Sequence, residues 1–274
     1  MNRRAQFLEV LGIPTEWLPR GTPDAPAAEA AAVAVAAEAG ADIESGIGTD
    51  IEPRKAAVAP PAPPALSALS AEPARAPDDA REAAIAAMDW SALGTAVAGC
   101  TACGLCGTRT NTVFGVGDPQ AEWMLVGEAP GENEDLQGEP FVGQAGKLLD
   151  NMLGALGLAR GRNVFIANVL KCRPPGNRNP EPGEVAQCEP YLRRQIALVK
   201  PKVIVVLGRF AAQSLLRSTT PIGKLRGAVH SYEGIPVVVT YHPAYLLRTL
   251  TDKARAWEDL CLAREVHDRA GAEA

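Results

Sequence analysis

Short apolar runs alternate with amphipathic stretches through the carboxyl-terminal two thirds of the chain. The apolar runs are rich in Val, Ile and Leu and cover residues 123–126, 164–169, 203–207 and 236–241. Between and after them, apolar positions recur with helical spacing over residues 143–158, 183–199, 209–217 and 252–269. Continuous apolar strands joined by helices are typical of a parallel sheet buried on both faces. We therefore predict an α/β fold with three α/β/α layers and a central, mostly parallel four-stranded sheet.

The first 80 residues differ in composition from the rest. Residues 21–80 are dominated by Ala and Pro and contain no aromatic residue, so they cannot bury enough apolar surface to offset the entropy of ordering. The net charge is −7 over residues 1–99 and +2 over residues 100–274. A mildly basic folded part permits DNA binding although the whole chain is acidic. We therefore predict a short peptide at 1–20, a disordered linker at 21–80 and one domain at 81–274.

Two helical segments are expected ahead of the sheet. Residues 3–11 place Phe7 and two leucines on one helical face, which is typical of a peptide that binds a protein partner. A helix that docks weakly on its own domain is the alternative. A second helix is predicted over residues 80–98, with Asp78 or Asp79 as its N-cap.

No segment of the sequence is typical of a membrane protein. No apolar run approaches the roughly 18 residues of a membrane span. The amino-terminal segment is interrupted by Glu9, Gly12 and Pro14, unlike a signal peptide. We expect a cytoplasmic protein that does not bind membranes, in a reducing compartment where clustered cysteines bind metal more often than they form disulfides.

The cysteines are spaced like metal ligands. A close pair precedes the first strand, and a wider pair follows the second; together they are Cys100, Cys103, Cys172 and Cys188. Four thiolates in this pattern suit either zinc or an iron–sulfur cluster, and their spacing does not separate the two. Cys106 could replace one of them or bind nothing. Cys261, in the last helix, is expected to be a small core residue.

Each predicted strand is followed by a polar motif. VGEAPG follows the first strand, NVLKCRPPGNRNP the second, LGR the third and YHPAYLLR the fourth. In an open parallel sheet, ligands bind at the carboxyl ends of the strands, so these segments are expected to form one site. GEAPG matches neither GxxxxGK[ST] nor GxGxxG, so a nucleotide-phosphate loop is not indicated.

Residues 127–149, GEAPGENEDLQGEPFVGQAGKLL, together with NVLKCRPPGNRNP and HPAYLLR, resemble the family-four, thermostable-type uracil-DNA glycosylases. The resemblance runs from about Cys100 to Arg248 and includes the four cysteines. It implies a [4Fe–4S] cluster on Cys100, Cys103, Cys172 and Cys188. It also implies a base excision repair enzyme, acting as a monomer, that flips uracil out of single- or double-stranded DNA and hydrolyses its N-glycosidic bond.

The resemblance assigns base recognition to three residues. Phe141, in EPFVG, matches the aromatic that stacks on uracil, a contact worth ~1–3 kcal/mol. Asn168 can donate to uracil O4 and accept from N3–H, whereas cytosine presents the reverse pattern. His242, in YHPAY, matches the histidine that donates to uracil O2 and stabilises the leaving anion. The alternatives are a core Phe, a capping Asn and a structural His.

The carboxylate that activates water is assigned less directly. The first family of uracil glycosylases carries its catalytic Asp where this chain has Ala129, so another carboxylate must act. Glu128 is the first choice for polarising the water. Glu134 is expected to close the pocket beside uracil C5, where it would disfavour the methyl group of thymine. Gly127 and Ala129 are expected to line the same pocket.

The last motif resembles the segment that enters the duplex. Leu246 and Leu247, with Arg248, would fill the gap left by the flipped base, as apolar wedges do in kinked DNA. Ordinary packing of a short amphipathic helix is the alternative. Further candidate phosphate contacts are Arg173, Arg226, Arg178 and Lys224.

Two other functions are consistent with part of the sequence. A covalent relative in the same superfamily traps the sugar with a histidine in a basic insertion, and residues 226–240 contain no such insertion. A non-catalytic DNA-binding scaffold with structural zinc would keep the cysteines but has no need for Phe141, Asn168 and His242 together.

Overall fold

The computed structural model describes residues 79–272, and the structural statements below refer to these residues. The predicted peptide at 1–20, almost all of the predicted linker at 21–80, and Asp78 lie outside them. None of the helices within 79–272 is long and apolar enough to cross a membrane. The expected monomeric state and cytoplasmic location stay predictions.

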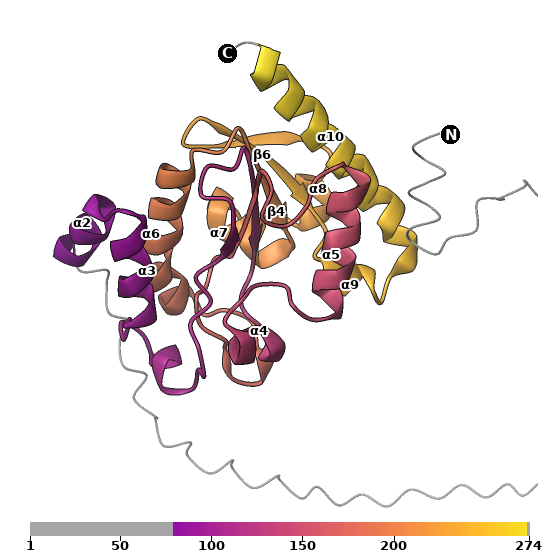
Figure 1. Cartoon of the computed structure of the whole chain (residues 1–274). Helices are drawn as coiled ribbons and strands as arrows, with labels where there is room; N and C mark the ends of the chain where they lie inside the picture. Colours follow the sequence, from indigo (N-terminus) through magenta and orange to yellow (C-terminus); the bar gives the residue numbers. More distant parts are fainter. Residues whose placement is uncertain (1–78, 273–274) are drawn as a thin grey trace, which may run out of the picture. The chain divides into compact units, whose positions relative to one another are not determined.

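A six-stranded sheet lies at the centre of the domain (Figure 1), with strand order β1-β3-β2-β4-β6-β5. Its four central strands are mutually parallel. They are β2 (Trp123–Gly127), β3 (Val164–Asn168), β4 (Val203–Leu207) and β6 (Ile235–Thr240). These match the four predicted apolar runs. The first three strands are buried throughout, as a sheet covered on both faces requires.

The sheet has six strands rather than the predicted four, because two short antiparallel strands extend the four parallel strands at the edges. β1 (Val116–Gly117) pairs with β3, and β5 (Val229–Tyr232) pairs with β6. β1 has two residues and is too short to produce a pattern. The residues of β5 alternate between exposed and half-buried, so β5 contains no apolar run.

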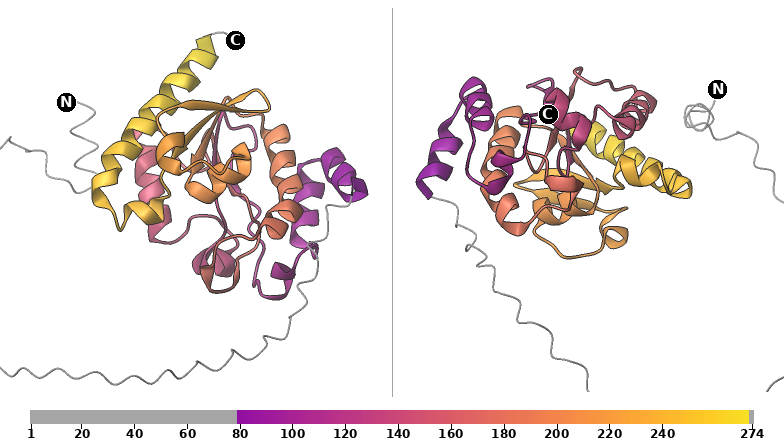
Figure 2. Two further views of the ribbon diagram at one scale, coloured as in Figure 1. Left: turned by 180° about the vertical axis from the view of Figure 1, so that it is seen from behind. Right: turned by 90° about the horizontal axis from the view of Figure 1, so that it is seen from below.

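Helices cover both faces of the sheet, which confirms the three layers (Figures 1 and 2). Successive residues of β2 point to opposite sides: Trp123 and Leu125 belong to one apolar cluster, and Met124 and Val126 belong to another. The first cluster includes residues of α5 (Gln144–Ala155), α9 (Pro243–Leu246) and α10 (Lys253–Ala272). The second includes residues of α6 (Pro182–Val199), α7 (Arg209–Leu216) and α8 (Ile222–Leu225). The connections contain α4 (Glu132–Gln137) and the 3-10 helices η1 (Gly104–Gly107), η2 (Pro175–Asn177) and η3 (Leu250–Asp252).

The single helix predicted over 80–98 is two helices, α2 (Asp79–Ala87) and α3 (Trp90–Ala98), both packed on α6. The break is at Asp89, whose side chain accepts a hydrogen bond from the backbone N–H of Ala92 at 2.8 Å. Asp competes with helical backbone bonding inside a helix but stabilises a new helix as its N-cap. The two helices form a third apolar cluster that includes Cys172 and Cys188.

Candidate active site

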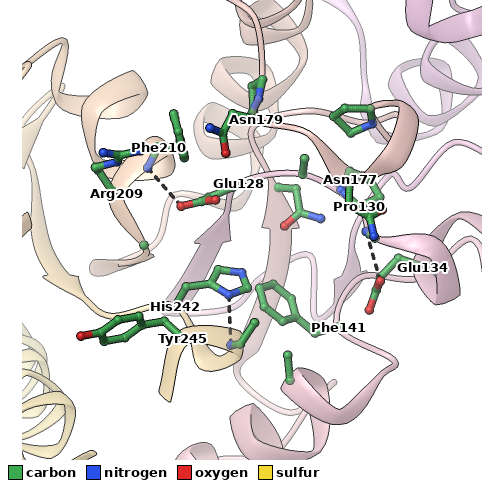
Figure 3. Close-up of a pocket in the computed structure, with 18 of the residues that line it drawn as sticks. Glu128, Pro130, Glu134, Phe141, Asn177, Asn179, Arg209, Phe210, His242 and Tyr245 are labelled. Atoms are coloured by element: carbon green, nitrogen blue, oxygen red, sulfur yellow. Dashed lines mark hydrogen bonds between the residues drawn. The ribbon is translucent and has the colours of Figure 1, made fainter. Parts of the chain in front are cut away.

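A cavity of about 830 Å³ opens where β2, β3, β4 and β6 end (Figure 3). The segments after all four strands line it, so the structure brings the four polar motifs together. The predicted site residues that line it are Glu128, Ala129, Glu134, Phe141, Asn168, Arg178, His242 and Arg248. Gly127 does not line the cavity but lies directly behind it.

Gly127 lets two functional side chains approach the end of β2. It is paired in register with Asn168 on β3. A Cβ on Gly127 would lie 2.4 Å from Asn168 Oδ1 and 2.7 Å from Phe141 Cζ, which no larger residue could tolerate without a shift. Glycine is therefore required here because of close side-chain approach rather than because of its own backbone angles.

Asn168 is only 2% exposed, and its Oδ1 has no hydrogen-bond partner among the described residues. A buried acceptor left unpaired costs about 1–3 kcal/mol. Because Asn168 also lines the cavity, its unpaired oxygen is available to a ligand that presents an N–H group.

Phe141 and His242 form an aromatic wall of the cavity. Their ring centroids lie 5.5 Å apart with an interplanar angle of 30°, and the two rings lie side by side in Figure 3. Phe141 is buried and has a backbone φ of +56°, which is uncommon for a bulky residue. The loop that carries it is therefore held by its surroundings.

His242 is a neutral hydrogen-bond donor in this site. It is the N-cap of α9, and its Nδ1 accepts the backbone N–H of Ala244 at 3.1 Å. Burial, with a smaller contribution from the charge of Arg248, lowers the pKa of His242 to about 4, although the charge of Glu134 opposes this shift. A neutral imidazole whose Nδ1 accepts must carry its proton on Nε2. The Nε2–H is therefore left for a ligand in the cavity.

Glu128 reaches across the cavity to the start of α7 (Figure 3). Its Oε1 accepts the backbone N–H of Phe210 at 3.1 Å. Burial raises the pKa of Glu128, and the Phe210 hydrogen bond and the charge of Arg209 partly oppose this rise. The result is a desolvated carboxylate with raised proton affinity beside the cavity.

Sequence reasoning did not single out Arg209 and Phe210, although both line the cavity. The guanidinium of Arg209 lies 4.4 Å from the centroid of the Phe210 ring. The only signal was their position directly after β4, within and beside the LGR motif.

Backbone N–H groups engage both carboxylate oxygens of Glu134, and its expected place beside uracil C5 stays a prediction. Oε2 accepts from the N–H of Gly131 at 3.1 Å. Oε1 accepts from the N–H groups of Val142 at 3.0 Å and Gly143 at 3.3 Å. Glu134 lines the cavity, but its carboxylate joins α4 to the residues that follow Phe141.

The structure separates the two leucines that were expected to enter DNA. Leu246 is 1% exposed and belongs to the core beneath α5 and α10, so the prediction for Leu246 as a wedge was wrong. Leu247 is 42% exposed, and Arg248 lines the cavity. Successive residues of a helix are turned by about 100°, so Leu246 can lie against the core while Leu247 faces solvent.

The expected arginine contacts are also divided. Arg226 is paired with Asp259 at 2.7 Å and lies over the Tyr241 ring, so it is not free to bind phosphate as expected. Arg173 donates to Asn177 Oδ1 at 2.7 Å at the edge of the site.

Five cysteines line one small cavity between the loop before the sheet and the segment after β3. They are the four predicted ligands and Cys106; Cys261 does not line it. Within residues 79–272, no three His, Cys, Asp or Glu side chains lie close enough together to hold a single metal ion. The five thiols are therefore neighbours, but they are not arranged around one point.

N–H groups point at three of these sulfurs. Arg109 Nη1 lies 3.2 Å from Cys172 Sγ, Arg81 Nη2 lies 3.9 Å from Cys100 Sγ, and the backbone N–H of Lys171 donates to Cys188 Sγ at 3.2 Å. These donors and cations suit a buried group of negative charge, which needs such compensation.

Lys171 also connects the cysteines to the active-site cavity. Its side chain is fully buried, and Nζ donates to the backbone carbonyl of Asn168 at 2.8 Å and to Gln195 Oε1 at 2.6 Å. One residue therefore contacts both the sulfur of Cys188 and the strand end that carries Asn168.

Comparisons with known proteins agree with this geometry. Residues 114–261 match the family model described as the uracil DNA glycosylase superfamily. The type-4 uracil-DNA glycosylase of Archaeoglobus fulgidus is 51% identical over 156 residues, which cover 54% of this chain and 78% of that protein. The type-4 enzyme of Sulfurisphaera tokodaii is 48% identical over 179 residues, covering 62% and 81% of the two chains. That of Pyrobaculum aerophilum is 41% identical over 185 residues, covering 64% and 93%. With its α/β fold and four converging motifs, this chain belongs to the uracil DNA glycosylase superfamily and, within it, to the type-4 uracil-DNA glycosylases.

Proposed function

We propose that this uracil-DNA glycosylase flips uracil into the cavity at the ends of β2, β3, β4 and β6 and hydrolyses its N-glycosidic bond there. The observation that carries the proposal is that one cavity is lined by buried Asn168, whose Oδ1 has no partner among the described residues, and by neutral His242, whose Nε2–H is left for a ligand. Both groups face a cavity walled by Phe141. Uracil offers the complementary set: an N3–H donor, two carbonyl acceptors and a flat ring.

Base recognition divides between Phe141 and Asn168. The flipped base stacks on Phe141, which is worth ~1–3 kcal/mol. Asn168 Oδ1 accepts from uracil N3–H, and its amide N–H donates to O4. Cytosine has an acceptor at N3 and a donor at C4, so it would leave both polar groups of the buried Asn168 unpaired.

Cleavage of the C1′–N1 bond leaves its electron pair on uracil, which departs as an anion. The Nε2–H of His242 donates to uracil O2, where the negative charge develops. A neutral donor of low pKa suits this role, because it stabilises the charge without having to be protonated at neutral pH.

Glu128 positions and polarises the attacking water. The water oxygen bonds to C1′ as the base leaves, and the proton that water loses passes to Oε2 or Oε1 of Glu128. Burial raises the pKa of this carboxyl, which favours proton uptake, and the Phe210 N–H orients it. Glu134 instead supports the loop that carries Phe141, as its three backbone contacts indicate.

We further propose that Cys100, Cys103, Cys172 and Cys188 hold a [4Fe–4S] cluster, with Cys106 as a neighbour. The four thiols line one small cavity, and cysteine thiolates are the ligands of such clusters. When bound, the cluster supplies structural cross-linking, since hydrolysis of an N-glycosidic bond needs no electron carrier. Lys171 links this cross-linked region to Asn168, because its Nζ donates to the backbone carbonyl of Asn168.

The test is release of free uracil from a single-uracil oligonucleotide, single-stranded or paired with G or A. We expect release with an alkali-labile abasic site, and no covalent protein–DNA adduct on a denaturing gel. We expect Asn168→Asp to lower kcat/KM by about 10²-fold, since one mispaired buried polar group costs about 1–3 kcal/mol. His242→Ala should cause a comparable loss. Asn151→Asp, the same change at an exposed position of α5, is the matched control.

Three results would contradict the proposal. Folded, cluster-containing protein that releases no uracil from any substrate would exclude the activity. A stable adduct would favour the covalent relative. Wild-type rates in both Asn168→Asp and His242→Ala would remove the assigned site.

A further inference from the structure

The backbone at Phe141 has a conformation that its own sequence does not favour. Phe141 has a φ of +56°, in the left-handed region that bulky side chains rarely adopt. Such a conformation persists only where the surrounding structure holds it, and such residues cluster at functional sites. The orientation of the Phe141 ring against His242 depends on this backbone.

Arg160 holds the carbonyls on both sides of the Phe141 residue. Its Nη1 donates to the carbonyl of Pro140 at 2.8 Å, and its Nη2 donates to the carbonyl of Phe141 at 2.8 Å. Asp150 on α5 orients the guanidinium, because its Oδ1 accepts from Arg160 Nε at 3.1 Å and lies 3.0 Å from Nη2. Only the planar fork of an arginine can make all of these contacts at once.

Glu134 holds the same turn from its other side, through the N–H groups of Val142 and Gly143. The turn is therefore held from two sides: the Arg160 guanidinium donates to its carbonyl groups, and the Glu134 carboxylate accepts from its N–H groups. Arg160 lies in the connection between α5 and β3, outside the cavity, and does not line it. Its contribution to the site must pass through Phe141.

We propose that Arg160, oriented by Asp150, is a positioning residue that holds Phe141 in its base-stacking conformation. This inference deepens the proposed function and rests on it. The competing explanation is an ion pair that only stabilises the end of α5, which would affect catalysis independently of the Phe141 ring.

A double-mutant cycle separates the two explanations. We expect Arg160→Lys to lower kcat/KM for uracil release by about 10- to 100-fold, because a shift of about 1 Å in a reacting constellation costs about that much. In a Phe141→Ala background the same change should alter kcat/KM by less than about twofold. An equal loss in both backgrounds would overturn the proposal. Arg194→Lys, which replaces a part-buried arginine bonded to the Met88 carbonyl, is the matched control and should behave as wild type.

Hydrogen exchange tests the same inference without activity. Arg160→Lys should speed exchange of the Val142 and Gly143 amides relative to wild type, and Arg194→Lys should not. Unchanged exchange together with unchanged kcat/KM would overturn the proposal. If wild type releases no uracil, the proposed function fails, and the exchange result still decides whether Arg160 holds the turn.

Asp150→Asn provides a second variant if Arg160→Lys does not fold. The Asp150 side chain is about half exposed, so its replacement should leave the fold intact. We expect a smaller loss of kcat/KM that again disappears in the Phe141→Ala background. A loss that persists there would contradict positioning through Phe141.

Discussion

Gly146, in the first turn of α5, lies against the carbonyl group of Phe141, and we expect Gly146→Ala to disable the enzyme. An added Cβ would lie 1.7 Å from Phe141 O and 2.3 Å from its carbonyl carbon, whereas ordinary contact begins at 3.4 Å. Both obstructing atoms are backbone, so the loop and the helix must separate by about 1.7 Å. A displacement of about 1 Å in a reacting constellation costs about 10²-fold, or about 2.7 kcal/mol of transition-state stabilisation. We therefore expect kcat/KM to fall by at least about 10²-fold.

Gly154, on the same helix, is the matched control. A Cβ there meets no atom within 4 Å. Alanine in place of glycine in a helix is favourable by roughly 0.5–1 kcal/mol, so Gly154→Ala should raise the melting temperature slightly and leave kcat/KM unchanged. Comparing the two variants distinguishes an effect of alanine on α5 itself from an effect of the contact between Gly146 and Phe141.

The assay is uracil release from an oligonucleotide under single-turnover conditions, with thermal melting of each variant alongside. A Gly146→Ala protein with kcat/KM within threefold of wild type would refute the packing argument. Equal losses in Gly146→Ala and Gly154→Ala would show that α5 itself, rather than the contact with Phe141, is sensitive.

Three further predictions follow from the same geometry. His242→Gln keeps a hydrogen-bond donor but removes the titrating ring. Since burial holds the pKa of His242 at about 4, the dependence of kcat/KM on pH above pH 5 should have the same shape in the variant and in wild type. A decline of kcat/KM toward pH 5 that is present in wild type and absent in the variant would contradict a neutral His242. Cys106→Ser should retain about four irons per chain, whereas Cys172→Ala should lose both iron and folded protein. Iron loss in Cys106→Ser would make Cys106 a ligand. A fully folded but inactive Cys172→Ala protein would point to a more direct role for the cluster. Hydrogen bonds led by that from Lys202 lower the pKa of Glu122 from 4.5 to about 2, so its carboxylate stabilises the fold above about pH 4.5, and this contribution is lost as the pH falls toward 2. The melting temperature of wild type should therefore fall more steeply than that of Glu122→Gln over this window, and parallel curves would contradict the assignment.

Local pattern was enough to predict the layers of this fold. The four central strands are continuous apolar runs because both of their faces are covered, and this leaves a signal within each segment. The edge strands β1 and β5 leave no such signal, since one has two residues and the other is partly exposed. The break at Asp89 was missed because an Asp inside a helical pattern can either face solvent or cap a new helix, and only the structure shows that it accepts from Ala92 N–H.

Strand order and motif position were enough to predict which segments form the site. Polar motifs after parallel strands had to meet at one edge, which placed Phe141, Asn168 and His242 around one cavity. The pairing of Glu134 with backbone amides could not be predicted, because a sequence does not show which backbone N–H groups lie near a given side chain. The burial of Leu246 beside exposed Leu247 depends on how α9 sits on the core.

The sequence by itself determined the fold class, the family and the residues available for chemistry, because periodicity, motif order and side-chain type are properties of the chain alone. Only the tertiary structure decided what each residue does. Within residues 79–272 it engages Nδ1 of His242 and so leaves Nε2–H available, leaves Asn168 Oδ1 without a partner, and brings Arg160 to the carbonyls of Pro140 and Phe141. The physical reason is that hydrogen bonding and burial are relations between segments distant in the chain, and they exist only after those segments have packed.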